Sequence, residues 1–282
     1  MDVYLADEQA FHYVPRFSVE VACDRINQKK TQLIAGTVGA LISRPKPEEI
    51  QMVSMESRLE PFWLVSVSAH TAFDRTRTFV VPVSGPEVQQ VTILGQEVSV
   101  DHVKDAPRVS LSGVEHCVVE LRAAHTFDGL TGNRTDMSKY LAYPKTLIVD
   151  LEHFSPAETI IIPPQVRASA VVRQVVAEVV QPVQQAHTIH EERVDVEAIE
   201  LNFRPVYALE FEWLAKAKRA VVEFDALTGE ISGGGRKLTD QVKGLVTRDL
   251  LFDVTADAVG IIFPGGSIAV KLVKAVVDRG KA

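Results

Sequence analysis

The sequence of 282 residues lacks the features that define several large protein classes. Its only cysteines, Cys23 and Cys117, are too few for a disulfide framework, so we expect a protein of the reducing cytoplasm. It has no charged, apolar leader, and no uninterrupted apolar run reaches the roughly 18 residues that a membrane-spanning helix needs. The net charge of -7 predicts no general attraction to nucleic acid.

The sequence also lacks the motifs of the common hydrolases. G-x-S-x-G, H-E-x-x-H and a paired-carboxylate signature are absent, so we predict no catalytic, cofactor-binding or metal-binding residue. His187 and His190 form an H-x-x-H motif, but they follow Pro182 and enter a predicted strand, where side chains three apart point to opposite faces. Cys117 lies in a predicted strand beside valines, which is typical of a buried, inert thiol.

Two glycine-containing stretches imitate ligand sites. Asp128, Asn133 and Asp136 supply oxygen side chains in one loop, but their spacing matches no EF-hand and is typical of ordinary turns. Residues 260–267 imitate a phosphate-binding loop, yet Gly266 stands where the lysine belongs. We therefore interpret this second stretch as a flexible break between two apolar segments.

What the sequence does contain is long stretches of alternating apolar and polar residues. Arg204–Gly229 predicts two strands joined by a basic turn, because Tyr207, Leu209 and Phe211 alternate with charged residues. Moved back by 144 residues, this stretch aligns without a gap onto Glu60–Gly85. We therefore expect an internal repeat of a strand-turn-strand segment.

The alignment of the two copies makes predictions for individual residues. Trp63 matches Tyr207, and we expect a core aromatic at both positions. Arg75 matches Arg219, and we expect both arginines at solvated turns, with a shared anion or partner contact as the alternative.

The predicted fold class is α+β, with two tandem helix-plus-three-strand antiparallel units flanking a strand-rich middle and a C-terminal helical tail. Helices are expected over about 21–42 and 166–179. Strands are expected at about 49–59, 61–72, 75–83, 189–202, 205–214 and 219–225, and a hairpin is expected around Leu94-Gly95 within Val91–Val100. Residues 1–20 are expected to be extended. The predicted divisions are an N-terminal arm at 1–20, the first unit at 21–85, the middle at 86–163, the second unit at 164–231 and the tail at 232–282.

The segment Val221–Ile231 resembles the closing hairpin of PepSY-type modules, whose last strand ends in a D-x-x-T-G-[EK] turn. Asp225, Thr228, Gly229 and Glu230 match that turn. The resemblance covers residues 165–231 and implies a binding or inhibitory domain rather than an enzyme.

The C-terminal tail carries the predicted partner-binding residues. Helices are predicted there over Leu238–Val254 and Ile268–Val277, apolar residues and lysines share the second of them, and exposed apolar surface usually marks a contact. The residues are Ile261, Ile262, Phe263, Ile268, Val270, Lys271, Leu272 and Lys274. Docking on a protein is the preferred interpretation, and contact with an anionic membrane surface is the alternative.

Two classes of function follow from these observations. The first is a non-enzymatic cytoplasmic binding or scaffold protein, which engages a protein partner or its own copy through paired sheets and the apolar tail. The second is an enzyme with a site between the two units, built from residues scattered along the sequence. A peripheral membrane protein held by its tail is a third possibility.

Overall fold

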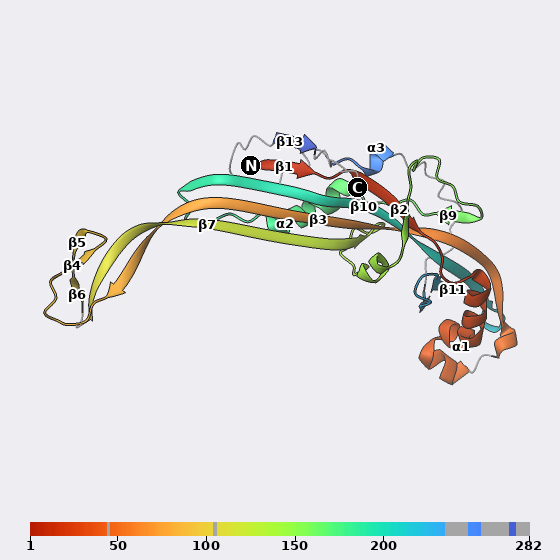
Figure 1. The fold of residues 1–282 in the computed structure, drawn as a ribbon. Helices are drawn as coiled ribbons and strands as arrows, with labels where there is room; N and C mark the ends of the chain where they lie inside the picture. The colour runs from red at the N-terminus through yellow and green to blue at the C-terminus, as the bar shows by residue number, and fades with distance from the viewer. Residues whose placement is uncertain (44–45, 104–105, 235–247, 255–270, 275–282) are drawn as a thin grey trace.

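The computed structural model describes residues 1–43, 46–103, 106–234, 248–254 and 271–274. Within them the chain forms a long, arched sheet with helices along it (Figure 1). The strands are β1 (Asp2–Leu5), β2 (Glu8–Tyr13), β3 (Ile50–Pro82), β4 (Gln90–Ile93), β5 (Gln96–Ser99), β6 (Asp101–Val103), β7 (Ala106–Asp128), β8 (Lys145–Leu147), β9 (Thr159–Ile161), β10 (Thr188–Trp213), β11 (Lys218–Asp225), β12 (Ile231–Gly233) and β13 (Lys271–Lys274). The helices are α1 (Val19–Ser43), α2 (Ala168–Val179) and α3 (Arg248–Leu251), with 3-10 turns η1 (Pro47–Glu49), η2 (Ser138–Ala142) and η3 (Leu214–Lys216).

Two very long antiparallel strands form the spine of the sheet. β3 has 33 residues and β10 has 26. They pair from Ile50 opposite Trp213 to Asp74 opposite Thr188, with three register shifts. At about 3.3 Å per residue, β3 extends over roughly 100 Å.

Shorter strands cover the outer edges of this spine in succession. Along β10 lie β1, β2 and β11, and along β3 lie β9 and β7. β1, β2 and β9 run parallel to their long partners, whereas β7 and β11 run antiparallel. The result is a mixed sheet of eleven strands.

Two prolines lie inside the spine without breaking it. Pro61 falls between β9, which pairs up to Leu59, and β7, whose pairing begins at Phe62. Pro205 falls between β2, which pairs up to Phe203, and β11. The carbonyl oxygens of both prolines point outward, toward Gly129 and Ala226, so the missing N–H of each also faces the gap between two edge strands. No ladder hydrogen bond is lost there.

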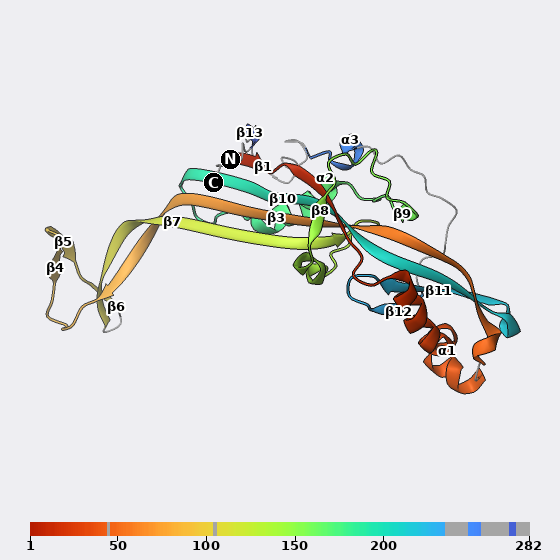
Figure 2. The ribbon, with the colours of Figure 1, turned by 45° about the vertical axis from the view of Figure 1, so that its right-hand side comes forward.

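The two larger apolar cores lie along the sheet, each under one long helix. In the middle, α2 packs on β3 and β7, and its buried side chains contact Trp63, Val65 and Val67. At the far end, α1 packs on β10, β11 and β12, where its Ala22 and Ile26 meet Leu209 and Phe211 (Figure 2).

The predicted α+β fold class is therefore wrong. Strand makes up 53% of the structure and helix 18%, and no pair of independent helix-plus-three-strand units exists among the described residues. Each long helix covers strands from the other part of the chain, because α1 precedes β3 but packs on β10 and β11. The predicted breaks near residues 60, 73 and 203 are also wrong, since β3 and β10 run straight through them.

The predicted hairpin at Glu60–Gly85 is wrong for the same reason. This stretch is one extended strand up to Pro82, whereas Arg204–Gly229 does reverse, through η3, into β11. Arg75 lies within β3 and not at a turn, and its Nε donates to Glu115 over 2.5 Å. Trp63 and Tyr207 are both core aromatics as predicted, in two different cores.

The predicted helical tail is also corrected. Lys271–Lys274, expected within a helix, forms strand β13 parallel to β1. Of the helix expected over 238–254, the single turn α3 falls within the described residues.

Several local predictions are confirmed. Helices α1 and α2 lie within a few residues of their predicted positions. A hairpin forms at β4 and β5, with Leu94 and Gly95 at φ 50° and 79° in its turn. Residues 2–13 are extended, as expected for the N-terminal arm.

Beyond Asp74 the sheet narrows to a two-stranded projection, which we call the finger (residues 75–115). Within the described part of the chain, β3 past Asp74 pairs with β7 alone, and β4, β5 and β6 lie at the tip (Figure 1). The remaining part, the body, holds both larger apolar cores.

Candidate functional site

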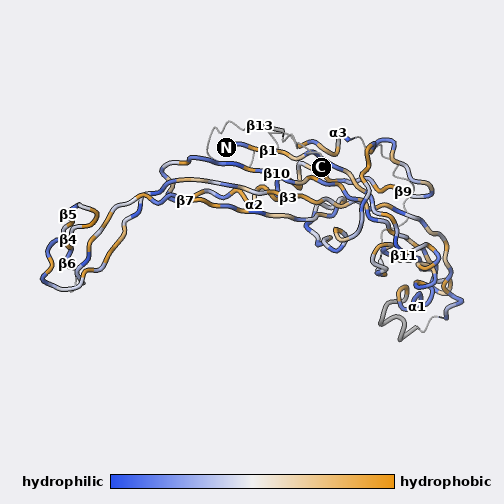
Figure 3. The backbone as a smooth tube through the Cα atoms, viewed as in Figure 1, coloured by the Kyte–Doolittle hydropathy of each residue, from blue (hydrophilic) through white to orange (hydrophobic). Residues whose placement is uncertain are grey.

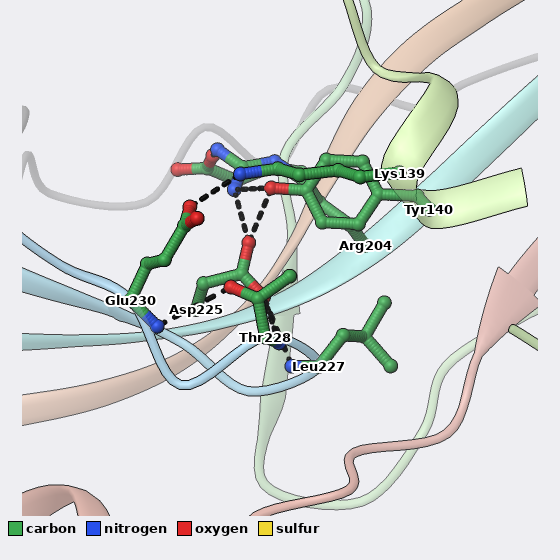
Figure 4. Close-up of polar contacts among 8 residues, drawn as sticks. Lys139, Tyr140, Arg204, Asp225, Leu227, Thr228 and Glu230 are labelled. Carbon is green, nitrogen blue, oxygen red and sulfur yellow. Dashed lines mark hydrogen bonds and ion pairs between the residues drawn. The ribbon is translucent and has the colours of Figure 1, made fainter. Parts of the chain in front are cut away.

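The most buried group of charged side chains lies where the body's strands change partners. Arg204 of β10 reaches the Glu60 carboxylate of β3 over 2.5 Å and the Asp225 carboxylate at the end of β11 over 3.0 Å. Its Nη1 also donates to the Tyr140 hydroxyl over 3.1 Å, and that hydroxyl donates to Asp225. Figure 4 shows the guanidinium between the tyrosine and the turn that follows β11.

The turn after β11 is built by the sequence motif itself. Asp225 Oδ1 accepts hydrogen bonds from the amides of Leu227 and Thr228, both over 2.9 Å. The amide of Gly229 then closes on the Asp225 carbonyl, with Gly229 at φ 77°. One carboxylate therefore shapes the turn with one oxygen and joins Arg204 with the other.

The pKa values in this cluster favour the charged arginine. Burial opposes its charge, but Glu60, Tyr140 and Asp225 outweigh that effect and raise the pKa of Arg204 above its ordinary value. Burial, helped by the hydrogen bond to Asp225, raises the pKa of Tyr140. Tyr140 therefore stays protonated and acts as a donor.

This cluster forms a structural clamp. Among the described residues, no buried side-chain nitrogen or oxygen lacks a hydrogen-bond partner. The donors and acceptors of the cluster are thus used within it, and the cluster ties β3, β10, the turn after β11 and η2 together.

A second polar cluster marks the base of the finger. Asp74 of β3 accepts from His116 Nδ1 of β7 over 2.7 Å and contacts His190 Nε2 of β10 over 2.8 Å. The hydrogen bonds from His190 and then His116 hold the pKa of Asp74 below its ordinary value. The cluster bridges three strands at the point where β10 begins.

A shallow groove of about 720 Å³ crosses β7, β3 and β10 in the body. Its charged lining alternates in sign, and neighbouring groups pair: His70 contacts Glu120, and Arg193 holds Asp195 over 2.8 Å. Since the charges are largely paired with one another, the groove presents no concentrated field to a ligand.

The finger exposes apolar side chains that no described core covers. Phe79, Val80, Val81 and Val114 are 44%, 55%, 41% and 50% exposed. The Phe79 ring lies over Gly113, where an added Cβ would come within 3.0 Å of it. In Figure 3 these apolar segments continue along the finger strands away from the body.

The residues predicted to bind a partner are only partly located. Ile261, Ile262, Phe263, Ile268 and Val270 lie outside the described residues, as does the phosphate-loop imitation at 260–267. Lys271, Leu272 and Lys274 lie in β13 beside β1.

The other candidate residues take ordinary structural roles. Asp128 Oδ1 accepts from the amides of Leu130 and Thr131, which is turn chemistry. His187 and His190 both contact one face of β3, at Thr76 and Asp74, because His190 lies in a register shift. The prediction that their rings point to opposite faces is therefore wrong. In the described ranges, no three His, Cys, Asp or Glu side chains are placed to hold a metal ion.

Comparisons with protein-family models, with curated protein sequences and with solved structures returned no match. The resemblance of residues 165–231 to PepSY-type modules therefore stays a prediction. Within the described residues, no helix combines the length and apolar character needed to cross a bilayer.

Sequence reasoning missed the clamp and the finger. The signal for the clamp was a single arginine, Arg204, between apolar residues of a strand, because a buried guanidinium requires nearby carboxylates. The signal for the finger was the apolar run Phe79-Val80-Val81, because no predicted helix or third strand was available to bury it.

Proposed function

We propose that this protein is a non-enzymatic scaffold that engages a protein partner through its finger. The observation that carries the proposal is the exposed apolar surface on both faces of a two-stranded ribbon, with Phe79 and Val81 on one face and Val80 and Val114 on the other. No helix or third strand of the described chain pairs with the stretch that carries these side chains, an isolated two-stranded ribbon is marginal in water, and exposed apolar surface usually marks contacts. A partner that packs against both faces of the ribbon accounts for both features.

The neighbouring chemistry supports a protein surface over a small molecule. At the base of the finger, Arg75 and Arg77 surround Glu115, so charged groups border the apolar patch. An apolar centre with a polar rim is the usual anatomy of a protein interface. Cys23 and Cys117 are free thiols, which supports a reducing compartment such as the cytoplasm.

The pairing of β13 with β1 favours docking of the tail on the chain's own sheet over contact with a membrane. Lys271–Lys274 then belong to the sheet, and the finger replaces the tail as the proposed partner-binding surface.

Site-specific photocrosslinking in the native host tests this proposal. A photoreactive amino acid at Val80, which is 55% exposed, should give a discrete adduct with another protein. The matched control is Val149, which is 84% exposed but lies in the body, and it should give none. Changing Val114, which lies on the same face of the ribbon as Val80, to Ser should remove the Val80 adduct without lowering the melting temperature. Equal adducts at both positions, or none at Val80, would reject the proposed function.

A further inference from the structure

Among the described residues, the outer edge of β7 is unpaired over most of its length. The amide of Asp128 donates outward to Asn133, and the carbonyl of Thr126 accepts from Thr135. β7 pairs with β3 without a register shift, so the outward groups belong to every second residue, from Ser110 to Ala124. Across the described part of the chain, no strand pairs with these groups.

This edge carries few of the features that protect edge strands. From Val109 to His125 the sequence has no proline and no lysine, and the pairing has no bulge. The ends are closed, by β6 opposite Arg108 and by the loop at Asn133–Thr135. By contrast, β1, β2 and β11 cover the outer edge of β10 in succession.

The charged side chains on this edge are complementary to those on the same edge of a second, antiparallel copy. Glu120 and Arg122 lie two residues apart on the same face of β7, with side chains 77% and 72% exposed. If a second copy pairs antiparallel about Leu121, Glu120 of each copy faces Arg122 of the other, and Val118 faces Ala124. This register makes two opposite-charge cross-strand pairs and no like-charge pair. It also places Leu121 opposite its own copy in a pair without hydrogen bonds, because the groups of Leu121 point to β3.

We propose that two copies of this chain join their β7 edges in an antiparallel pair centred on Leu121. The paired stretch is residues 117–125 of each copy, because the loop at Asn133–Thr135 already occupies the outer edge of Thr126–Asp128, and the two strands diverge beyond it. Over this stretch the pairing continues both sheets into one, and it is isologous, so it closes at a dimer. Because the strands run in opposite directions, the two fingers project from opposite ends. This inference rests on the proposed function and adds that the scaffold is bivalent.

The mass of the full chain in solution, by light scattering and sedimentation, tests the dimer. The wild type should have twice the chain mass of 31.0 kDa. Glu120→Arg and Arg122→Glu should each weaken the dimer by about tenfold or more, because each creates like-charge pairs across the two-fold. The double variant restores opposite charges and should return to within about threefold of the wild type. Loss of the intrachain contacts of Arg122 with Glu197 and of Glu120 with His70 cannot produce such a rescue.

Disulfide trapping tests the register. Cα atoms in a pair without hydrogen bonds are about 4.5 Å apart, within the range of a disulfide. Leu121→Cys in a Cys117→Ala background should therefore form a covalent dimer under mild oxidation. The wild type should not, since its Cys117 faces His125 of the other copy.

Two results would overturn the inference. One is a monomeric wild type at every concentration. The other is a covalent dimer through Cys117 in the wild type together with none in the Leu121→Cys variant. A monomer that still gives the Val80 adduct would reject the dimer and leave the proposed function standing. A dimer that gives no Val80 adduct would reject the proposed function and leave the dimer standing.

Discussion

Trp63 and Phe79 lie on the same strand and the same face, yet they have opposite environments. Sixteen residues separate them along β3, and the unshifted pairing with β7 keeps odd-numbered side chains on one face. Trp63 is fully buried and donates from its indole N–H to the Val166 carbonyl over 3.0 Å, whereas Phe79 is 44% exposed. The difference lies in what packs over the strand: the chain around α2 covers Trp63, and no described segment covers the ring of Phe79 to the same extent. Whether a side chain of β3 is buried therefore depends on which segment packs over it, and not on the alternation of apolar and polar residues along the strand.

The same contrast applies to polar groups. In the body, Arg204 has a side chain only 19% exposed and meets two carboxylates and a phenol. At the base of the finger, the partners of Asp74 are histidines that are 81% and 53% exposed. Solvent screens the second cluster, so we expect it to contribute much less to stability.

The largest expected effect compares the two aromatics. Trp63→Ala should lower the free energy of unfolding by about 3–5 kcal/mol, because it leaves a cavity and an unsatisfied Val166 carbonyl. Phe79→Ala should change it by less than about 0.5 kcal/mol. Chemical denaturation of both variants measures the difference, and similar losses would contradict the division into body and finger.

The clamp provides the next comparison. Arg204→Met should cost about 3 kcal/mol or more, because it leaves the Glu60 and Asp225 carboxylates buried without their cation. The matched control is Arg193→Met, since Arg193 is 46% exposed beside Asp195 and should cost below about 1 kcal/mol. An Arg204 variant as stable as this control would show that the clamp contributes little.

Glycines at two turns test the contrast on a smaller scale. Gly229 and Gly95 both have positive φ, at 77° and 79°. An added Cβ at Gly229 would lie 2.8 Å from Arg25 and 3.0 Å from Phe17, but at Gly95 it would meet nothing within 4 Å. Gly229→Ala should therefore cost about 2 kcal/mol and Gly95→Ala about 1 kcal/mol. Thermal unfolding of the two variants gives the order, and the reverse order would refute the steric argument.

The smallest expected effect concerns pH at the base of the finger. The folded pKa of Asp74 lies below its ordinary value of 3.8, so its stabilisation is present above that pH and is lost as the pH falls below it. Asp74→Asn should therefore destabilise the protein at pH 7 and have a smaller effect near pH 3. Denaturation at both values measures this, and an effect that grows on acidification would contradict the assignment.

Local sequence chemistry determined a large part of this structure. Apolar spacing located α1 and α2, and Leu94-Gly95 specified the hairpin at the finger tip, where only a positive φ completes the turn. The motif from Asp225 to Glu230 likewise encodes its own turn, since its carboxylate, hydroxyl and glycine act within six residues. These elements depend on neighbours in the chain, and so they can be read from it.

The tertiary structure alone decided how far the strands run and what covers them. Pro61 and Pro205 look like strand ends in the sequence, but each lies where one edge strand gives way to the next and no donor is needed. Likewise, α1 and α2 pack on strands distant in sequence, and the Arg204 clamp joins segments up to 144 residues apart. Hydrogen-bond partners, cores and open edges of a sheet are set between segments that meet only after folding, and for that reason no local pattern encodes them.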